Sequence, residues 1–265
     1  MLFTEILNCD RTSLFLNKEI TLNSGQTSLI SSVLRRRISG EPLQYIIGET
    51  EFMGLEFKVT PDVFIPRPET EILVETAIKQ LSVSNYRLKI LDLGTGSGNI
   101  AVALAKYLPQ AEIYATDISN YALEIARTNA KLNRVEEKIK FVQSDLFTAY
   151  SLQLTAFDLI VSNPPYITEA EIEVLQPEIR YEPRIALDGG KDGLDFYRRI
   201  IKGSGHYLKK GGFLILEMGF RQAKEIRNIF KDSGIFKIID VMKDYNNIKR
   251  VVVAQLLVKM VRTNG

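Results

Sequence analysis

The stretch Ile90-Leu-Asp-Leu-Gly94-Thr-Gly-Ser-Gly98-Asn-Ile-Ala-Val-Ala-Leu-Ala105 decides the fold of this chain. An apolar run typical of a buried strand ends at Gly94, and an apolar helical pattern begins directly after Gly98. Glycines in such a turn let the backbone approach a ligand closely, and the first amides of the helix offer hydrogen-bond donors. We therefore expect a strand–turn–helix unit that binds a nucleotide-like ligand through Gly94, Thr95, Gly96, Ser97 and Gly98; the alternative is a tight packing turn.

Strands and helices alternate around this unit. The patterns predict strands at 89–93, 112–117, 138–143, 157–162, 212–218, 235–241 and 250–256, and helices at 99–108, 121–132, 194–208 and 222–232. This alternation is typical of a mostly parallel sheet covered by helices. The last two strands are joined without a helix, so they must be antiparallel. We expect an α/β fold with a Rossmann-like sheet and an antiparallel closing strand.

Three regions follow one another along the 265 residues. Apolar residues recur at helical spacing between Leu29 and Ile38, and Gly40 and Pro42 end that pattern, which predicts a small helical domain over 1–47 that docks the substrate. Alternating apolar and charged residues around Gly54 predict a β-hairpin linker over 48–60. Residues 61–265 then form the predicted catalytic domain.

Composition excludes several classes of protein. The 34 Lys and Arg residues nearly balance the 32 Asp and Glu residues, for a net charge of +2, so a basic nucleic-acid surface is not indicated and stable nucleic-acid binding is not expected. One cysteine and one histidine argue against a disulfide framework and against a metal site. We find no signal peptide and no apolar run of about 18 residues, and we expect a cytoplasmic protein without membrane contact.

An acidic residue ends the strand that follows the glycine turn. Asp117 lies about 20 residues after Gly98, where a carboxylate accepts hydrogen bonds from ribose hydroxyls; the alternative is an aspartate that caps the next helix. NAD and S-adenosylmethionine both place an adenosine there. The spacing Gly-x-Gly-x-Gly differs from the one that suits a pyrophosphate, and Asp92 would repel phosphates but tolerate a sulfonium or ammonium group. The pattern favours S-adenosylmethionine.

The remaining predicted contacts of this ligand lie just after the strands at 112–117 and 138–143. We assign Ile118 to the cofactor site beside Asp117. After the third strand, Asp145 is placed to accept from the exocyclic amine of adenine, and Leu146 to supply an apolar wall. These positions complete the predicted cofactor set together with Asn163.

The second motif, Asn163-Pro164-Pro165-Tyr166, follows the strand at 157–162, at the sheet edge where open α/β sheets bind ligands. A planar NH₂ group has a delocalised lone pair, so a methyl acceptor of this kind needs hydrogen-bond acceptors for its protons. The side-chain oxygen of Asn163 and the carbonyl of Pro164 supply them, the prolines stiffen the loop, and Tyr166 packs on the flat group. We interpret these four residues as catalytic and substrate-binding; the alternative is a structural turn.

Five stretches carry a family resemblance. They are Arg35-Arg-Arg-Ile-Ser-Gly-Glu-Pro42 with Gln44-Tyr-Ile-Ile-Gly48, Glu51-Phe-Met-Gly-Leu-Glu-Phe-Lys-Val59, Phe64-Ile-Pro-Arg-Pro-Glu-Thr-Glu71, Asn163-Pro-Pro-Tyr-Ile167, and Glu182-Pro-Arg-Ile-Ala-Leu-Asp-Gly-Gly-Lys-Asp-Gly-Leu194. Together they resemble the PrmC/HemK family of release factor glutamine methyltransferases. The segment before Arg35 is short for that family, and Leu146 stands where an aromatic residue is common.

The resemblance implies a class I S-adenosylmethionine-dependent methyltransferase fold. It also implies methyl transfer to the side-chain amide nitrogen of the glutamine in the Gly-Gly-Gln motif of bacterial peptide chain release factors. Cofactor contacts would fall at 94–98, Asp117, Leu146 and Asn163, and substrate contacts at 163–166. Two alternatives remain: a nucleic-acid methyltransferase acting on the exocyclic amine of adenine or guanine, which would share the 163–166 loop, and a silent adenosyl-binding scaffold.

Three further segments each allow two interpretations. Pro66 to Glu71 is either a flap in which Arg67 or Phe64 closes the site, or the start of a helix at Pro68. The segment from Glu182 to Asp192 is either a rim on the substrate side or a solvated loop that caps the next helix. Arg35 to Arg37 either meets RNA or an acidic partner, or is the charged end of a helix, which we favour.

Overall fold

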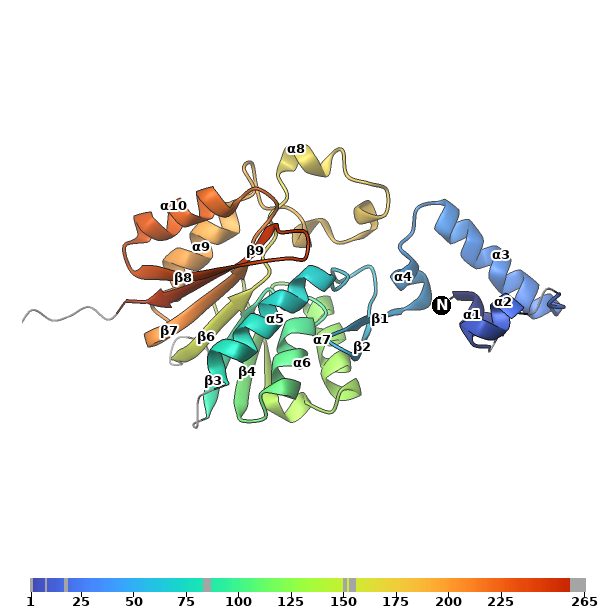
Figure 1. Ribbon diagram of the computed structural model, residues 1–265, viewed down its shortest axis with the longest axis horizontal. Coiled ribbons are helices and arrows are strands. Elements are labelled where there is room, and N and C mark those ends of the chain that lie inside the picture. Colours follow the sequence, from blue (N-terminus) through green and yellow to red (C-terminus); the bar gives the residue numbers. More distant parts are fainter. Residues whose placement is uncertain are drawn as a thin grey trace, which may run out of the picture.

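In a computed structural model of the chain, a seven-stranded sheet forms the centre of the molecule (Figure 1). The structure describes residues 2–7, 9–16, 19–82, 87–149, 152 and 156–257. The strand order is β5-β4-β3-β6-β7-β9-β8. The strands are β3 (Leu88–Leu93), β4 (Ala111–Asp117), β5 (Ile139–Gln143), β6 (Phe157–Ser162), β7 (Leu208–Glu217), β8 (Phe236–Lys243) and β9 (Lys249–Leu256).

The direction of the strands confirms the predicted fold class. Strands β5, β4, β3, β6 and β7 pair in parallel, whereas β9 inserts between β7 and β8 and runs antiparallel to both. The short connection from β8 to β9 forces this reversal, because a parallel pair needs a long crossover. The chain therefore has the Rossmann-like sheet with an antiparallel closing strand that its sequence predicts.

Helices cover both faces of the sheet. Helices α5 (Pro68–Leu81), α6 (Asn99–Tyr107) and α7 (Asn120–Leu132) pack on one face, and α9 (Asp195–Ser204) and α10 (Ala223–Ser233) on the other. Each face has its own apolar core, and the central strands β3, β4 and β6 are buried nearly throughout, β6 at all six positions. Burial on both faces explains why these strands are continuous apolar runs in the sequence.

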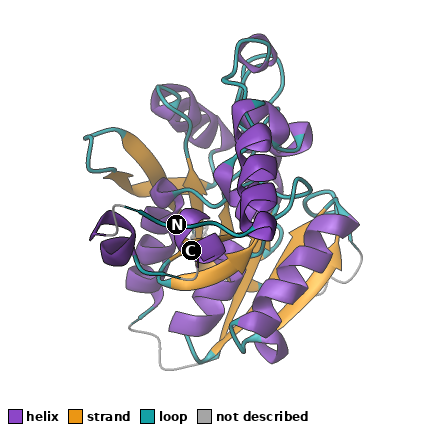
Figure 2. Ribbon diagram, turned by 90° about the vertical axis from the view of Figure 1, so that its right-hand side faces the viewer, coloured by secondary structure: helices purple, strands orange, loops and turns teal. Residues whose placement is uncertain are grey.

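Before residue 60, the described residues form helices and a hairpin. Helices α1 (Leu2–Leu7), α2 (Arg11–Leu16), α3 (Ser24–Ile38) and α4 (Leu43–Ile47) lie to one side of the sheet (Figure 1), and Figure 2 views the molecule from that side. Strands β1 (Glu49–Phe52) and β2 (Leu55–Lys58) pair antiparallel. The side chain of Asn129 on α7 bonds both the amide and the carbonyl of Lys58, so the hairpin is fastened to the sheet domain. The division at 47 and 60 stays a prediction.

The helix predicted at 194–208 is shorter in the structure, and the next strand starts earlier. Helix α9 ends at Ser204, and β7 begins at Leu208 rather than Gly212. Pairing with β6 takes precedence over the helical pattern, because the amide of Phe157 donates to the carbonyl of Tyr207 and Leu208 pairs with Phe157. Within the described part of the chain, no helix combines the length and the apolarity needed to cross a membrane.

Candidate active site

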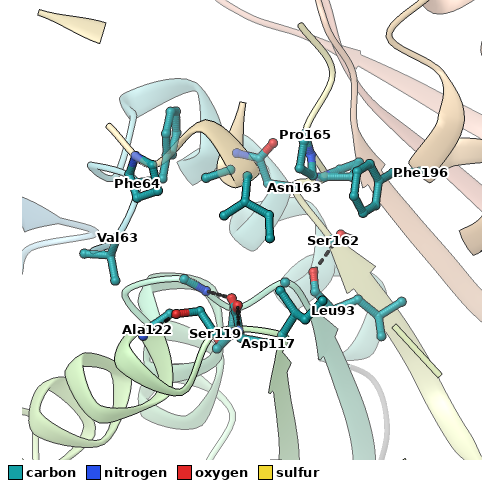
Figure 3. A pocket seen from close by; sticks show the side chains of 18 of the residues that line it. Val63, Phe64, Leu93, Asp117, Ser119, Ala122, Ser162, Asn163, Pro165 and Phe196 are labelled. Carbon is teal, nitrogen blue, oxygen red and sulfur yellow. Dashed lines mark hydrogen bonds between the residues drawn. The ribbon is translucent and has the colours of Figure 1, made fainter. Parts of the chain in front are cut away.

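One cavity lies at the carboxyl ends of β3, β4 and β6, with Phe64 and Asn163 on one side, Asp117 and Ser119 on the opposite side and Phe196 at one end (Figure 3). Twelve of the predicted site residues line it: Gly94, Thr95, Gly96, Ser97, Asp117, Ile118, Asp145, Leu146, Asn163, Pro164, Pro165 and Tyr166. The fold thus brings two motifs that are about 65 residues apart in the sequence to one site. Gly98 is not among the lining residues.

The glycine turn forms an open cradle at the end of β3. Gly94 has φ +71° and Gly96 has φ +56°, and a Cβ at either position would meet no atom within 4 Å. Gly98 has a different role. Its φ is +81°, and a Cβ added at this position would lie 2.9 Å from Cβ of Ala126 on α7. Gly94 and Gly96 therefore leave room for a ligand, whereas Gly98 lets two helices approach each other.

Two polar atoms beneath the cradle have no hydrogen-bond partner within the described residues. They are Oγ of Ser97, which lines the cavity, and Oδ1 of Asp92; the other carboxylate oxygen of Asp92 accepts from Oγ1 of Thr95 at 2.6 Å. Burial raises the pKa of Asp92 to about 7. A buried group of this kind favours a ligand with a donor or a positive charge. The open glycines and the unpaired Ser97 hydroxyl on the cavity wall therefore fit S-adenosylmethionine, and Asp92 is buried without lining the cavity itself.

Asp117 faces this cradle from the end of β4. Its Oδ2 accepts from the Gly96 amide and its Oδ1 from the Ser119 amide, both at 2.9 Å. The N-cap of α7 is Ser119, whose hydroxyl accepts from Ala122, so the interpretation of Asp117 as the helix cap is wrong. Each carboxylate oxygen can accept a second hydrogen bond. Burial raises the pKa of Asp117, and its role toward a ribose stays a prediction.

The predicted adenine end contains an additional aromatic side chain. Asp145 pairs with Arg199 at 2.7 Å, so the exposed carboxylate already has a cationic partner. Leu146 is buried with φ +53°, a conformation that is uncommon for leucine. Phe196, in the first turn of α9, lines the cavity, and the guanidinium of Arg199, the partner of Asp145, lies 5.6 Å from the centre of its ring. Sequence reasoning missed Phe196, because an apolar residue at a helix start normally indicates only packing.

Asn163 is held by a contact from another element. Its Nδ2 donates to Oγ1 of Thr70 on α5 at 3.1 Å, and that hydroxyl donates to Oε2 of Glu217 at the end of β7 at 2.7 Å. The amide nitrogen of Asn163 is therefore engaged by Thr70, whereas no hydrogen bond to its Oδ1 is found within the described residues, so this oxygen can accept one from a ligand. Sequence reasoning missed Glu217, because nothing in its local pattern separates it from a residue at a strand end.

The segments with two interpretations are resolved by their contacts. Helix α5 begins at Pro68, which confirms the helix-start interpretation; Phe64 lines the cavity, and its closing over the cofactor stays a prediction. Arg67 pairs with the buried Glu182, whose other oxygen accepts from the Ile65 amide. Glu182 is therefore a buried anchor of the cavity wall, neither a rim nor a solvated residue, and burial raises its pKa.

The charged side chains of the other two segments are paired within the chain. Asp192 accepts from the Leu194 amide just before α9 and pairs with Arg198, as a capping loop would. Arg36 pairs with Glu41, and Arg37 pairs with Glu178. These contacts favour the interpretation of this arginine run as the charged end of α3.

Comparison with known proteins identifies the family. The chain is 44% identical over 252 residues to the release factor glutamine methyltransferase of Geobacter sulfurreducens, covering 95% of this chain and 86% of that protein. It is 46% identical to the enzyme of the same name from Thermodesulfovibrio yellowstonii, covering 94% and 88%. The chain belongs to the release factor glutamine methyltransferase family. The family assignment makes it an S-adenosylmethionine-dependent methyltransferase.

Matches to domain families and to solved structures agree with this family. The PrmC N-terminal domain matches residues 1–48, so the segment before Arg35 is recognised despite its length, and the methyltransferase small domain matches residues 57–180. A methyltransferase from Pyrococcus furiosus superposes with a TM-score of 0.56 at 18% identity, covering 89% of this chain and 100% of that one. The ribosomal protein L11 methylase of Lactobacillus delbrueckii gives 0.53 at 21%, covering 76% and 84%. These two structures share the fold.

Proposed function

We propose that this protein methylates the side-chain amide nitrogen of the glutamine in the Gly-Gly-Gln motif of bacterial peptide chain release factors. The relatives at 44% and 46% identity carry the name of this activity. The structural observation that carries the proposal is that Asn163 lines the cavity with its nitrogen engaged by Thr70, so that its side-chain oxygen can accept from a substrate. An acceptor at the end of β6 suits a substrate that presents an NH₂ group.

The residues of the 163–166 loop hold and orient the amide. Oδ1 of Asn163 and the carbonyl of Pro164 each accept one N–H, which turns the nitrogen toward the glycine cradle and draws electron density onto it. Tyr166 is positioned from behind, since Nε2 of Gln222 donates to its carbonyl at 3.0 Å. When bound in the cradle, S-adenosylmethionine supplies an electrophilic methyl group. The protein thus contributes positioning and hydrogen bonding.

Binding of the donor is assigned to the opposite side of the cavity. We assign Gly94 to Ser97, Asp117 and Ile118 to the ribose and methionine parts, and Asp145, Leu146 and Phe196 to the adenine. Phe64 lines the wall above them, and the Arg67–Glu182 pair, which does not line the cavity itself, anchors the segment that carries Phe64. Gly98 supports the cradle indirectly by its approach to Ala126.

The partner that follows from this proposal is a release factor, docked by the helices of residues 1–47. Release factors act on ribosomes, so the proposal also places the enzyme in the bacterial cytoplasm. We propose no stable nucleic-acid complex, since the net charge is only +2.

The deciding experiment locates the transferred methyl group. The purified protein is incubated with labelled S-adenosylmethionine and a release factor, either intact or with Gly-Gly-Gln changed to Gly-Gly-Ala, and the label is mapped by mass spectrometry. We expect label on that glutamine alone and none on the altered factor. Label on DNA or RNA instead would assign the site to a nucleic-acid amine methyltransferase.

A further inference from the structure

Three side chains from separate elements form a hydrogen-bonded row that runs from the cavity wall, where Asn163 and Thr70 lie, to Glu217 in the interior. Asn163 follows β6, Thr70 lies in the first turn of α5, and Glu217 ends β7. Nδ2 of Asn163 lies 3.1 Å from Oγ1 of Thr70, which lies 2.7 Å from Oε2 of Glu217. Thr70 and Glu217 are 1% and 2% exposed, so water does not compete for these bonds.

The chemistry of the row determines which way the Asn163 amide points. An ionised carboxylate only accepts hydrogen bonds, so the Thr70 hydroxyl must donate its single proton to Glu217. The hydroxyl oxygen can then only accept, and Asn163 must present its NH₂ group to it. In the opposite orientation, the NH₂ group of Asn163 would face the NH₂ group of the substrate amide, and neither could accept a hydrogen bond from the other.

We propose that Thr70 and Glu217 are positioning residues that fix the side-chain amide of Asn163 with its oxygen toward the substrate. This inference rests on the proposed function, because it assigns the residues that prepare Asn163 to accept from the glutamine amide. Neither residue needs to contact the reacting atoms. Their effect passes through the orientation of one side chain.

Protonation of Glu217 would allow the hydrogen bonds in this row to run in the opposite direction. A protonated carboxyl can donate to Thr70, whose hydroxyl could then donate to Oδ1 of Asn163 and turn the amide around. Burial raises the pKa of Glu217 to about 7. The charged and titratable groups around it are Glu69 on α5, which raises the pKa, Arg250 on β9, which lowers it, and Tyr166 and Tyr197. Turnover should therefore fall as the pH drops below about 7.

The first test removes the hydroxyl while keeping the shape of the side chain. Thr70→Val should lower kcat for release factor methylation by tenfold or more, with KM and the Kd for S-adenosylmethionine changed less than about threefold. Thr70→Ser, which keeps the hydroxyl, should restore most of the rate. The matched control is Thr76→Val on the same helix, where the hydroxyl bonds only to the Ile72 carbonyl in the described structure. Unchanged turnover of Thr70→Val, or an equal loss of donor affinity, would overturn the inference.

The second test uses the pH profile of Glu217→Gln. Glutamine can still accept from Thr70 but does not titrate, so the acid limb of kcat should disappear while the rate near pH 8 stays within about tenfold of wild type. An acid limb identical to that of wild type would contradict the part assigned to Glu217.

A measurement without turnover separates this inference from the proposed function. In ¹⁵N-labelled protein, the side-chain NH₂ signals of Asn163 are identified by their loss in Asn163→Ala. Their exchange with solvent at pH 8 should be slow in wild type and at least tenfold faster in Thr70→Val. Slow exchange in both proteins would refute the row, whatever the substrate is. If the exchange result holds but wild type does not methylate the release factor, the proposed function is at fault.

Discussion

At the scale of single residues, the cavity separates groups that bind the donor from groups that orient the acceptor. Asp117 belongs to the first kind, because its carboxylate holds the Gly96 amide and faces the cradle. Asn163 belongs to the second kind, because its amide is held from behind by Thr70. This separation lets the two roles be measured independently.

We expect Asp117→Ala to weaken binding of S-adenosylmethionine by about 1–3 kcal/mol, through lost hydrogen bonds to the ribose and a looser Gly96 turn. Titration calorimetry measures this directly. Asp145→Ala should have a smaller effect, because Asp145 is exposed and paired with Arg199. A dissociation constant for Asp117→Ala equal to that of wild type would exclude the ribose contact.

Asn163→Ala should lower kcat by about 10² or more and leave the Kd of the donor nearly unchanged, because the residue orients and polarises the acceptor. Steady-state kinetics and calorimetry on the same preparation test this. Comparable losses in turnover and donor affinity would show that Asn163 acts mainly as a donor ligand.

The ionised form of Glu217 should destabilise the folded protein at neutral pH. Its pKa is raised from 4.5 to about 7, so the folded state holds its proton more tightly than the unfolded state. The group has no effect below pH 4.5, and as the pH rises to 7 and beyond its ionisation lowers the free energy of unfolding by about 3 kcal/mol. Glu217→Gln should therefore be more stable than wild type at pH 8 but not at pH 4.

Urea denaturation at the two pH values measures this difference. Glu225→Gln, at an exposed position on α10, serves as the control and should change stability little at either pH. Equal stability of Glu217→Gln and wild type at pH 8 would mean that the buried carboxylate is fully compensated by its neighbours.

At the scale of elements, the turn from β3 to α6 must satisfy both a ligand and a neighbouring helix. Gly98→Ala combines a left-handed backbone with a Cβ 2.9 Å from Ala126, so α6 and α7 must separate. We expect the free energy of unfolding to fall by about 1–3 kcal/mol more than for Gly234→Ala. Gly234 has φ +65° and open space around it, so Gly234→Ala introduces the backbone strain without a steric contact. Denaturation curves that coincide for the two variants would disprove the role of helix approach.

At the scale of the whole molecule, the loop beside the cavity is joined to the end of α3. Arg37 pairs with Glu178, and Oη of Tyr181 donates to the Ser39 carbonyl at 3.1 Å. The same loop continues to Pro183, Ile185 and Leu187, which line the cavity. The helices proposed to dock the release factor are thus in contact with the segment that borders its glutamine.

Breaking both contacts with Glu178→Ala and Tyr181→Phe should raise KM for the release factor severalfold, with the donor Kd unchanged. The effect is modest because exposed ion pairs contribute at most about 1 kcal/mol each. Kinetics with varied release factor measure it. Glu173→Ala, whose carboxylate pairs with Arg184 within the loop, is the matched control. A rise in KM of the same size in the control would remove the link to α3.

The sequence by itself determined the fold class and the two motifs of the site. Strand and helix periodicity, the glycine spacing and the loop at 163–166 are local patterns, and local patterns are visible in one sequence. The boundary between α9 and β7 was not predictable, because pairing with β6 takes precedence over the helical pattern there. The parts of Gly98 and Glu182 were misjudged for a similar reason, since each depends on a contact with a distant element.

Only the tertiary structure decided which residues support the motifs. Thr70, Phe196 and Glu217 lie 93, 33 and 54 residues from Asn163, counted along the printed sequence. Their positions are ordinary in sequence: a helix start, another helix start and a strand end. They meet because the carboxyl ends of parallel strands and the helix starts beside them converge at one edge of the sheet, and this convergence exists only in the folded chain.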